Sequence, residues 1–184
     1  HLETQHARLE GNGALEIVRF GGPAIGKTAL LRGVRAFLAA GAAHPKLTFL
    51  GGEPALHPGL LRAAVTLARR LGGGGLPIKV FTNGTLLTPG LLDFLERSGV
   101  EIVLSLDGPQ AVNDARRRFR AGRRSVYRAA LASFRGRELP AVSLVVGPAD
   151  AAGLAASLRA LVRAGFRKIA WAPDISARWD EAAR

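Results

Sequence analysis

The chain has 184 residues, 48% hydrophobic and 22% charged, which is ordinary for a globular protein with its own core. It has no apolar run of the ~18 residues that a membrane helix needs and no signal-peptide layout, so we expect a cytoplasmic protein without a membrane partner. It also has no cysteine, which excludes disulfides, zinc–thiolate sites and cysteine nucleophiles within this chain.

The net charge is +12, from 26 Lys and Arg residues against 14 Asp and Glu residues. Such an excess favours an anionic partner, either nucleic acid or an acidic peptide. The basic residues are spread along the chain, however, with one denser cluster at Arg116–Arg124. Because no basic stretch is interleaved with the several aromatic residues that a stacking platform for bases requires, we do not expect nucleic-acid binding.

Apolar segments of strand and helix type alternate along the chain, which predicts an α/β fold with a parallel sheet. The predicted strands are Leu15–Phe20, Lys46–Leu50, Ile78–Phe81, Val100–Leu106, Ala141–Val146 and Arg167–Ala172. The predicted helices are Ala29–Ala40, Pro58–Leu71, Pro89–Arg97 with Thr88 as its N-cap, Ser125–Arg135 and Ala151–Ala164.

Four of these strands end in a polar or glycine-rich segment, namely Gly51–Pro54, Thr82–Gly84, Ser105–Pro109 and Ala172–Asp174. Parallel sheets and barrels bind their ligands at the C-terminal ends of the strands. We therefore expect the functional site at these four segments.

The residue types at the strand ends suit a polar ligand. Gly51 and Gly52 allow a close backbone approach that a Cβ atom would prevent. Ser105 and Asp107 alternate along an apolar strand, so both can offer acceptors on the same face. Asn83 is placed to orient a ligand from the neighbouring strand end.

Three segments carry a family resemblance. They are the Gly-Gly-Glu-Pro stretch in Phe49–Pro58, the Thr-Asn-Gly-Thr-Leu-Leu stretch Thr82–Leu87, and Leu104–Pro109 with Asn113-Asp114 and Arg117 downstream. In this order, with one helix between each pair, they resemble radical S-adenosylmethionine (SAM) enzymes of the SPASM-type branch that modifies peptides and proteins. The resemblance implies a partial (β/α)6 TIM-like barrel with parallel strands.

The resemblance also implies a chemistry. Members of this family cleave SAM reductively with a [4Fe–4S] cluster, and the 5′-deoxyadenosyl radical formed abstracts hydrogen from the substrate, as in the maturases of peptides and proteins. By resemblance, the SAM amino group meets Gly51, Gly52, Glu53 and Pro54. Asn83, Ser105 and Asp107 would line the rest of the site, and Arg117 would pair with the SAM carboxylate.

The chain departs from the family at the cluster ligands. The family pattern Cys-x3-Cys-x2-Cys places its second and third cysteines at Thr4 and Ala7, and its first immediately before His1. Neither Thr nor Ala ligates iron as a thiolate does, so we expect no metal and no reductive cleavage of SAM by this chain. We expect residues 1–184 to form a single domain whose natural N-terminus and C-terminal extension lie outside this sequence.

Two alternatives remain open at this point. One is a non-catalytic barrel that binds SAM, a peptide or a protein. The other is a P-loop NTPase, because Gly21–Thr28 fits the pattern G-x4-G-K-[ST] between a predicted strand and a predicted helix. In that case Lys27 would reach the outer phosphates, Thr28 would hold Mg²⁺, and Asp107 would serve as the Walker B acid. Pro23, which removes a loop amide donor, weighs against this alternative.

Overall fold

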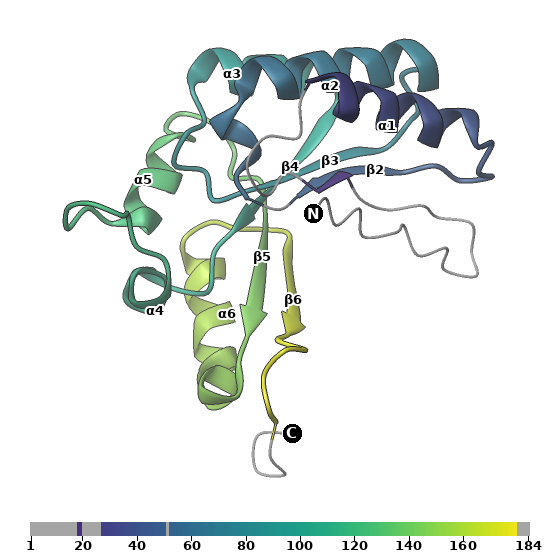
Figure 1. The fold of residues 1–184 in the computed structure, drawn as a ribbon. Helices are drawn as coiled ribbons and strands as arrows, with labels where there is room; N and C mark the ends of the chain where they lie inside the picture. The colour runs from purple at the N-terminus through teal and green to yellow at the C-terminus, as the bar shows by residue number, and fades with distance from the viewer. Residues whose placement is uncertain (1–17, 20–26, 51, 180–184) are drawn as a thin grey trace. The chain divides into compact units, whose positions relative to one another are not determined.

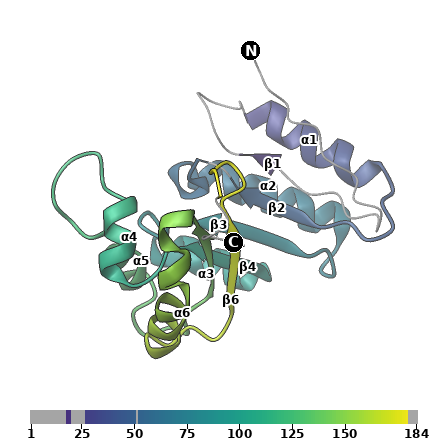
Figure 2. The same cartoon turned by 90° about the horizontal axis from the view of Figure 1, so that it is seen from below.

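The structure is a computed structural model, and it describes residues 18–19, 27–50 and 52–179. The chain divides into two compact units. Unit 1 comprises residues 1–82 and 89–102, and unit 2 comprises residues 83–88 and 103–184. Figures 1 and 2 give two views of the chain, and the two units are described in turn below.

The described residues form a parallel sheet whose strand order follows the chain, β1-β2-β3-β4-β5-β6. The strands are β1 (Val18–Arg19), β2 (Leu47–Leu50), β3 (Ile78–Thr82), β4 (Val100–Ser105), β5 (Ala141–Val146) and β6 (Ile169–Pro173). Strand β1 pairs with β2 and β2 with β3, while β4 pairs with β5 and β5 with β6, all in parallel. The predicted α/β fold, a partial barrel of parallel strands joined by helices, is confirmed.

Helices connect these strands. The α-helices are α1 (Lys27–Ala39), α2 (Pro58–Gly72), α3 (Pro89–Arg97), α4 (Gln110–Arg116), α5 (Val126–Ala132) and α6 (Leu154–Arg163). Two short 3₁₀ helices, η1 (Pro54–Leu56) and η2 (Pro148–Gly153), follow β2 and β5. None of the described helices is both long and apolar enough to span a membrane.

The core of unit 1 lies between its helices and the sheet. Helix α2 begins at a proline and buries apolar residues at helical spacing, among them Leu61, Val65 and Ala68. Phe49 of β2 and Val80 of β3 are also almost fully buried, and Figure 1 shows α1 and α2 on the same side of these strands. Each large apolar side chain buried in this way contributes about 2 kcal/mol to folding.

One arginine joins the C-terminal ends of two helices in unit 1. Arg69 of α2 donates to the carbonyl oxygens of Ser98 (2.6 Å) and Gly99 (2.9 Å), which follow α3. The same guanidinium donates to the carbonyl oxygens of the loop that follows α2, at Gly73, Gly74 and Leu76. It therefore satisfies helix-end and loop carbonyls that have no partner within the helices.

Unit 2 is built on β5 and β6, with α6 beside them in Figure 1. Val142 and Leu144 of β5 are buried, as are Leu161 of α6 and Phe166 just after it. Strand β5 alternates buried and more exposed side chains, as expected of a strand covered by a helix on one face. This arrangement fixes the end of β5 and the start of η2, where part of the site described below is found.

Most predicted elements appear with nearly the predicted bounds, and the differences are at short or irregular segments. The predicted helix Ser125–Arg135 is shorter, because Ser125 caps α5 and the chain turns after Ala132. The predicted helix Ala151–Ala164 begins in the 3₁₀ turn η2 and becomes α-helical at Leu154. Helix α4 was not predicted, and of the predicted first strand only β1 lies within the described residues.

Candidate functional site

In unit 1, Glu53 joins the ends of two strands. It follows β2 and caps η1, and its side chain accepts a hydrogen bond from the Ala55 amide at 3.0 Å. The same oxygen, Oε1, accepts a hydrogen bond from Thr82 Oγ1 at 2.6 Å, and Thr82 is the last residue of β3. Glu53 is only 8% exposed, so the carboxylate is held in a fixed position at the strand ends.

The residues on either side of Glu53 form a turn. Gly52 is exposed and has φ of +52°, a left-handed conformation that favours glycine. Pro54 is buried and begins η1, whereas Gly51 lies outside the described residues. The backbone of the turn is therefore exposed at Gly52, and the buried Glu53 side chain holds the turn through its hydrogen bonds with Ala55 and Thr82.

In unit 2, Asn83 shapes the loop that follows β3. Its Oδ1 accepts hydrogen bonds from the Thr85 amide at 2.9 Å and from Thr85 Oγ1 at 2.7 Å. Ser133 Oγ donates to the carbonyl oxygen of Gly84 at 2.9 Å, which ties this loop to the end of α5. The side-chain carbonyl of Asn83 thus forms an Asx turn, and its predicted role in orienting a ligand stays a prediction.

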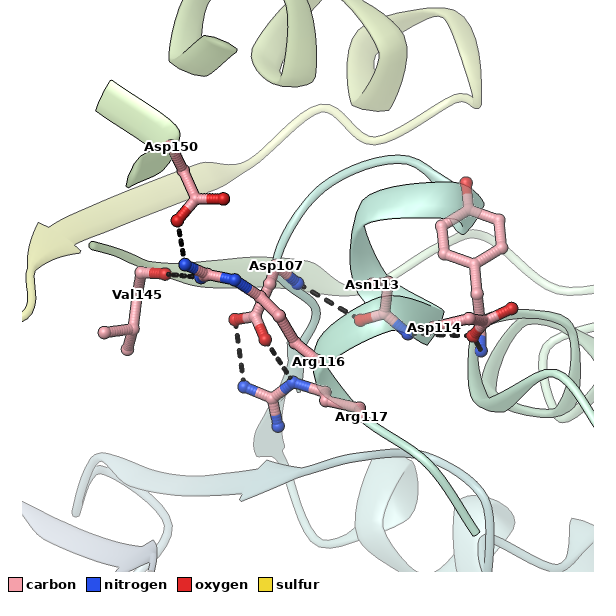
Figure 3. A network of polar contacts seen from close by, with 8 residues as sticks. Asp107, Asn113, Asp114, Arg116, Arg117, Val145 and Asp150 are labelled. Carbon is pink, nitrogen blue, oxygen red and sulfur yellow. Dashed lines mark hydrogen bonds and ion pairs between the residues drawn. The ribbon is translucent and has the colours of Figure 1, made fainter. Parts of the chain in front are cut away.

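After β4, Asp107 and Arg117 form a bidentate ion pair, drawn in Figure 3. Arg117 Nε lies 2.7 Å from Asp107 Oδ2, and Arg117 Nη2 lies 3.0 Å from Asp107 Oδ1. The Asp107 side chain is 7% exposed and the Arg117 side chain 31% exposed. Ser105, the last residue of β4, is half-buried two positions before Asp107.

Helix α4 is held to this strand end by Asn113. Asn113 is fully buried, and its Oδ1 accepts a hydrogen bond from the Asp107 amide at 3.2 Å. Its Nδ2 donates to Asp114 Oδ1 at 3.3 Å, and Asp114 in turn accepts from the Tyr127 amide at 3.0 Å. The Asn-Asp pair therefore connects the end of β4 to the start of α5.

The environment of Asp114 favours its charged form. Burial by itself would raise the pKa of this carboxyl group. Hydrogen bonds from the Ser125 side chain, from the backbone of Tyr127 and Val126, and from Asn113 outweigh burial, and the pKa of Asp114 falls below its ordinary value of 3.8.

Arg116, the last residue of α4, connects this helix to β5 and η2. Its Nη1 donates to the carbonyl oxygen of Val145 in β5 at 3.0 Å, and its Nη2 forms an ion pair with Asp150 of η2. Figure 3 shows these contacts beside the pair formed by Asp107 and Arg117. Consecutive arginines thus attach α4 to the ends of β4 and β5.

Several residues of these networks had no role assigned from the sequence, among them Thr82, Asn113 and Arg116. Thr82 and Asn113 lie inside the segments that carry the family resemblance, so their positions were available from the sequence. Their hydrogen bonds depend on strand register and on α4, which the sequence pattern did not reveal. No sequence signal pointed to Arg116.

The donors required by a [4Fe–4S] cluster are not supplied by this chain. Such clusters are held by cysteine thiolates, and the chain has no cysteine. Thr4 and Ala7, the residues at the expected cysteine positions, lie outside the described residues. Within the described ranges no group of three His, Asp or Glu residues could hold a metal ion. The residues present therefore do not fit the cluster.

The P-loop alternative rests on the start of α1. Lys27 and Thr28 are the first two residues of this helix, and both are exposed. The rest of the motif, residues 21–26, lies outside the described residues. Asp107, the residue proposed as its acidic partner, forms the ion pair with Arg117.

Solved structures share the fold. A structure of native anSMEcpe with bound AdoMet matches with a TM-score of 0.68 and 21% sequence identity, over 80% of this chain and 42% of that one. Native anSMEcpe with bound AdoMet and the Cp18Cys peptide gives a TM-score of 0.68 at 21% identity, over 81% and 43% of the two chains. SuiB of Streptococcus suis gives 0.58 at 14% identity, over 85% and 36%.

This chain therefore spans about two fifths of the length of the solved chains it matches. A sequence comparison with curated proteins gives no match. The radical SAM superfamily profile, by contrast, matches residues 18–150, which is well over half of the chain. It covers β1 to β5 and therefore all three segments that carry the resemblance. The chain belongs to the radical SAM superfamily.

Proposed function

We propose that this protein binds SAM at the C-terminal ends of β2 and β3, as the barrel part of a protein that modifies a peptide or protein substrate. The observation that supports this most is the buried Glu53 carboxylate, which joins the ends of both strands through Ala55 and Thr82. A carboxylate fixed beside an exposed, left-handed Gly52 forms an acceptor-rich edge. Such an edge suits an ammonium group.

SAM brings to this edge an amino group, a carboxylate and an adenosyl sulfonium. Glu53 would attract the amino group by charge, and the backbone of Gly52 would accept a hydrogen bond from it. Pro54 and Thr82 would hold Glu53 in place, because one begins η1 and the other donates to the carboxylate. Asn83, Ser105, Asp107 and Arg117 stay predicted SAM contacts, to be tested separately by substitution.

We do not propose that these 184 residues cleave SAM reductively. The thiolates that hold the cluster in this family have no counterpart here, since the chain has no cysteine. Binding without cleavage corresponds to the non-catalytic alternative, a barrel that holds SAM or a peptide.

A peptide partner is supported by the structural neighbours. The anSMEcpe structures include complexes with AdoMet and either the Cp18Cys or the Kp18Cys peptide. These two structures match 81% and 78% of this chain, respectively. By analogy of fold, we propose that this protein also takes a peptide or protein partner. The analogy does not identify that partner.

Isothermal titration calorimetry with SAM tests the proposal. We expect the wild-type protein to bind SAM and Glu53→Gln to bind it about tenfold more weakly, because the charge-assisted contact is lost. Glu101→Gln is the matched control, since Glu101 is an exposed residue of unit 1 that pairs with Lys79, and its affinity should equal that of the wild type. An absence of SAM binding by the wild type, or equal affinity in all three proteins, would contradict the proposal.

The P-loop alternative is favoured by one observation, the position of Lys27 and Thr28 at the start of α1 after β1. A second titration with Mg-ATP separates the two functions. Binding of Mg-ATP that is lost in Lys27→Ala, without binding of SAM, would establish a nucleotide site at residues 21–28 instead.

A further inference from the structure

The loop that joins α4 to α5 carries the densest positive charge in the described chain. We call residues 118–125 the arginine hairpin, because Arg118 pairs with Ser125 in an antiparallel bridge. Its four arginines, Arg118, Arg120, Arg123 and Arg124, are all exposed. No Asp or Glu occurs in the sequence from residue 115 to residue 137.

We propose that the arginine hairpin binds an acidic segment of a polypeptide partner. The proposal rests on the proposed function, because that partner would be the peptide or protein on which the barrel acts. It adds to that function the chemical class of the segment and the surface that receives it.

The hairpin has an ordered shape before any partner binds. Gly122 has φ of +84° at its tip, and the guanidinium of Arg124 lies 5.3 Å from the ring centre of Phe119. At its base, Ser125 Oγ accepts a hydrogen bond from the Arg128 amide and caps α5. Within unit 2, Figures 1 and 2 both show this loop projecting from the helices it joins. Pre-organised groups lose less entropy when they bind.

The charge of the hairpin is not cancelled by its neighbours. The two arginines that precede the hairpin already form ion pairs with nearby carboxylates. Arg116 pairs with Asp150, and Arg117 pairs with Asp107. Asp114, close to the base, accepts hydrogen bonds from backbone amides. None of the ion pairs found among the described residues includes an arginine of the hairpin.

The hairpin favours carboxylates over a nucleic acid strand. A guanidinium donates two parallel hydrogen bonds to a carboxylate and equally to a phosphate, so charge alone does not separate these partners. Single-stranded nucleic acid also needs aromatic side chains on which its bases stack. The hairpin has one aromatic residue, Phe119, which is half-buried and lies against Arg124.

Fluorescence anisotropy with a labelled oligoglutamate peptide tests the proposal. The hairpin variant is the triple substitution Arg118→Gln, Arg120→Gln and Arg123→Gln. Its matched control is Arg35→Gln, Arg70→Gln and Arg97→Gln, which removes the same charge from three exposed arginines of unit 1. At ~0.1 M salt, we expect about tenfold weaker binding for the hairpin variant and less than a twofold change for the control.

Two further probes complete the experiment. Circular dichroism should show the same thermal unfolding for both variants and the wild type, because the substituted arginines are exposed. Labelled oligothymidylate of equal length should bind more weakly than oligoglutamate. Tighter binding of oligothymidylate that is lost in the hairpin variant would overturn the proposal in favour of nucleic acid.

Equal effects of the two triple variants on oligoglutamate binding would also overturn the proposal, because the binding would then reflect the overall charge. The absence of oligoglutamate binding would overturn it as well. These measurements contain no SAM, so their failure is distinguishable from a failure of SAM binding in the calorimetric test.

Discussion

Among the residues that the structure describes, the Asp107 carboxylate accepts side-chain hydrogen bonds from one guanidinium, that of Arg117. Both carboxylate oxygens accept hydrogen bonds from Arg117, and the Asp107 side chain is nearly removed from solvent. The Asp107 backbone amide is held separately by Asn113. The residue is therefore fixed at two points, and Arg117 already has a partner before any ligand binds.

A double-mutant cycle measures how strongly the two side chains are coupled. We expect Arg117→Ala to lower the free energy of unfolding by about 2 kcal/mol, because it leaves a nearly buried carboxylate without its charged donor. In the Asp107→Asn background the same substitution should cost less, with a coupling energy of about 1 kcal/mol. Urea denaturation of the four proteins provides the values, and strictly additive effects would contradict the coupling.

The hydrogen bonds of Asp114 predict a pH dependence. Because the pKa of Asp114 is lowered in the folded protein, its charged form stabilises the fold at pH values above 3.8. This stabilisation is lost as the pH falls below 3.8 and through the lower pKa of the folded state. We expect Asp114→Asn to be less stable than the wild type at pH 7, with a smaller difference at pH 3.

Chemical denaturation at the two pH values checks this prediction. Glu138→Gln is the control, since Glu138 is an exposed carboxylate that follows α5 in the same unit. A difference between Asp114→Asn and the wild type that does not change between pH 7 and pH 3 would contradict the assignment.

At the scale of the elements, the loop after β3 packs closely against its neighbours in unit 2. Gly84 has φ of +77°, and a Cβ atom at this position would lie 2.7 Å from Leu104 Cδ2 and 3.0 Å from Ala130 Cβ. We expect Gly84→Ala to lower the free energy of unfolding by about 3 kcal/mol, from backbone strain and overpacking together.

Gly122 provides the matched control for the overpacking part of this effect. It has φ of +84°, but no atom lies within 4 Å of the position that a Cβ would take. Gly122→Ala should therefore cost only about 1 kcal/mol, the part due to backbone strain. Thermal or urea unfolding gives both values, and equal costs would show that the contacts with Leu104 and Ala130 do not matter.

The ends of α2 and α3 depend on Arg69, which donates to carbonyl oxygens in two segments of unit 1. Arg69→Lys keeps the charge but loses the planar set of donors, so we expect a loss of about 2 kcal/mol. Arg70→Lys, at the next and exposed position, should change the stability little. Urea denaturation compares the two variants, and equal stabilities would contradict the role given to Arg69.

Elements with clear start and stop signals were predictable. Helix α3 has its predicted bounds because Pro89 opens it and Gly99, with φ of +62°, follows its end. Helix α4 has seven residues and no apolar periodicity. It is held by the contact of Asn113 with Asp107, six residues earlier, and by that of Arg116 with Val145 in β5, 29 residues later. Local sequence carries no signal for such contacts.

At the scale of the whole molecule, the alternation of apolar segments and three strand-end motifs was enough to predict the fold class and the family. The contacts within the site were less predictable, because they depend on strand register. Glu53 and Thr82 are 29 residues apart in sequence, and their hydrogen bond exists only because β2 and β3 pair in the observed register. The bidentate pair of Asp107 and Arg117 likewise depends on the unpredicted helix α4.

The proposed function depends on the claim that SAM binds where β2 and β3 end, and backbone amide NMR of the ¹⁵N-labelled protein locates that binding residue by residue. On titration with SAM, we predict chemical-shift changes concentrated at Gly52, Glu53 and Thr82, with the amides of Lys27 and Thr28 unchanged. Shift changes confined to Lys27 and Thr28, or no changes at saturating SAM, would contradict the claim.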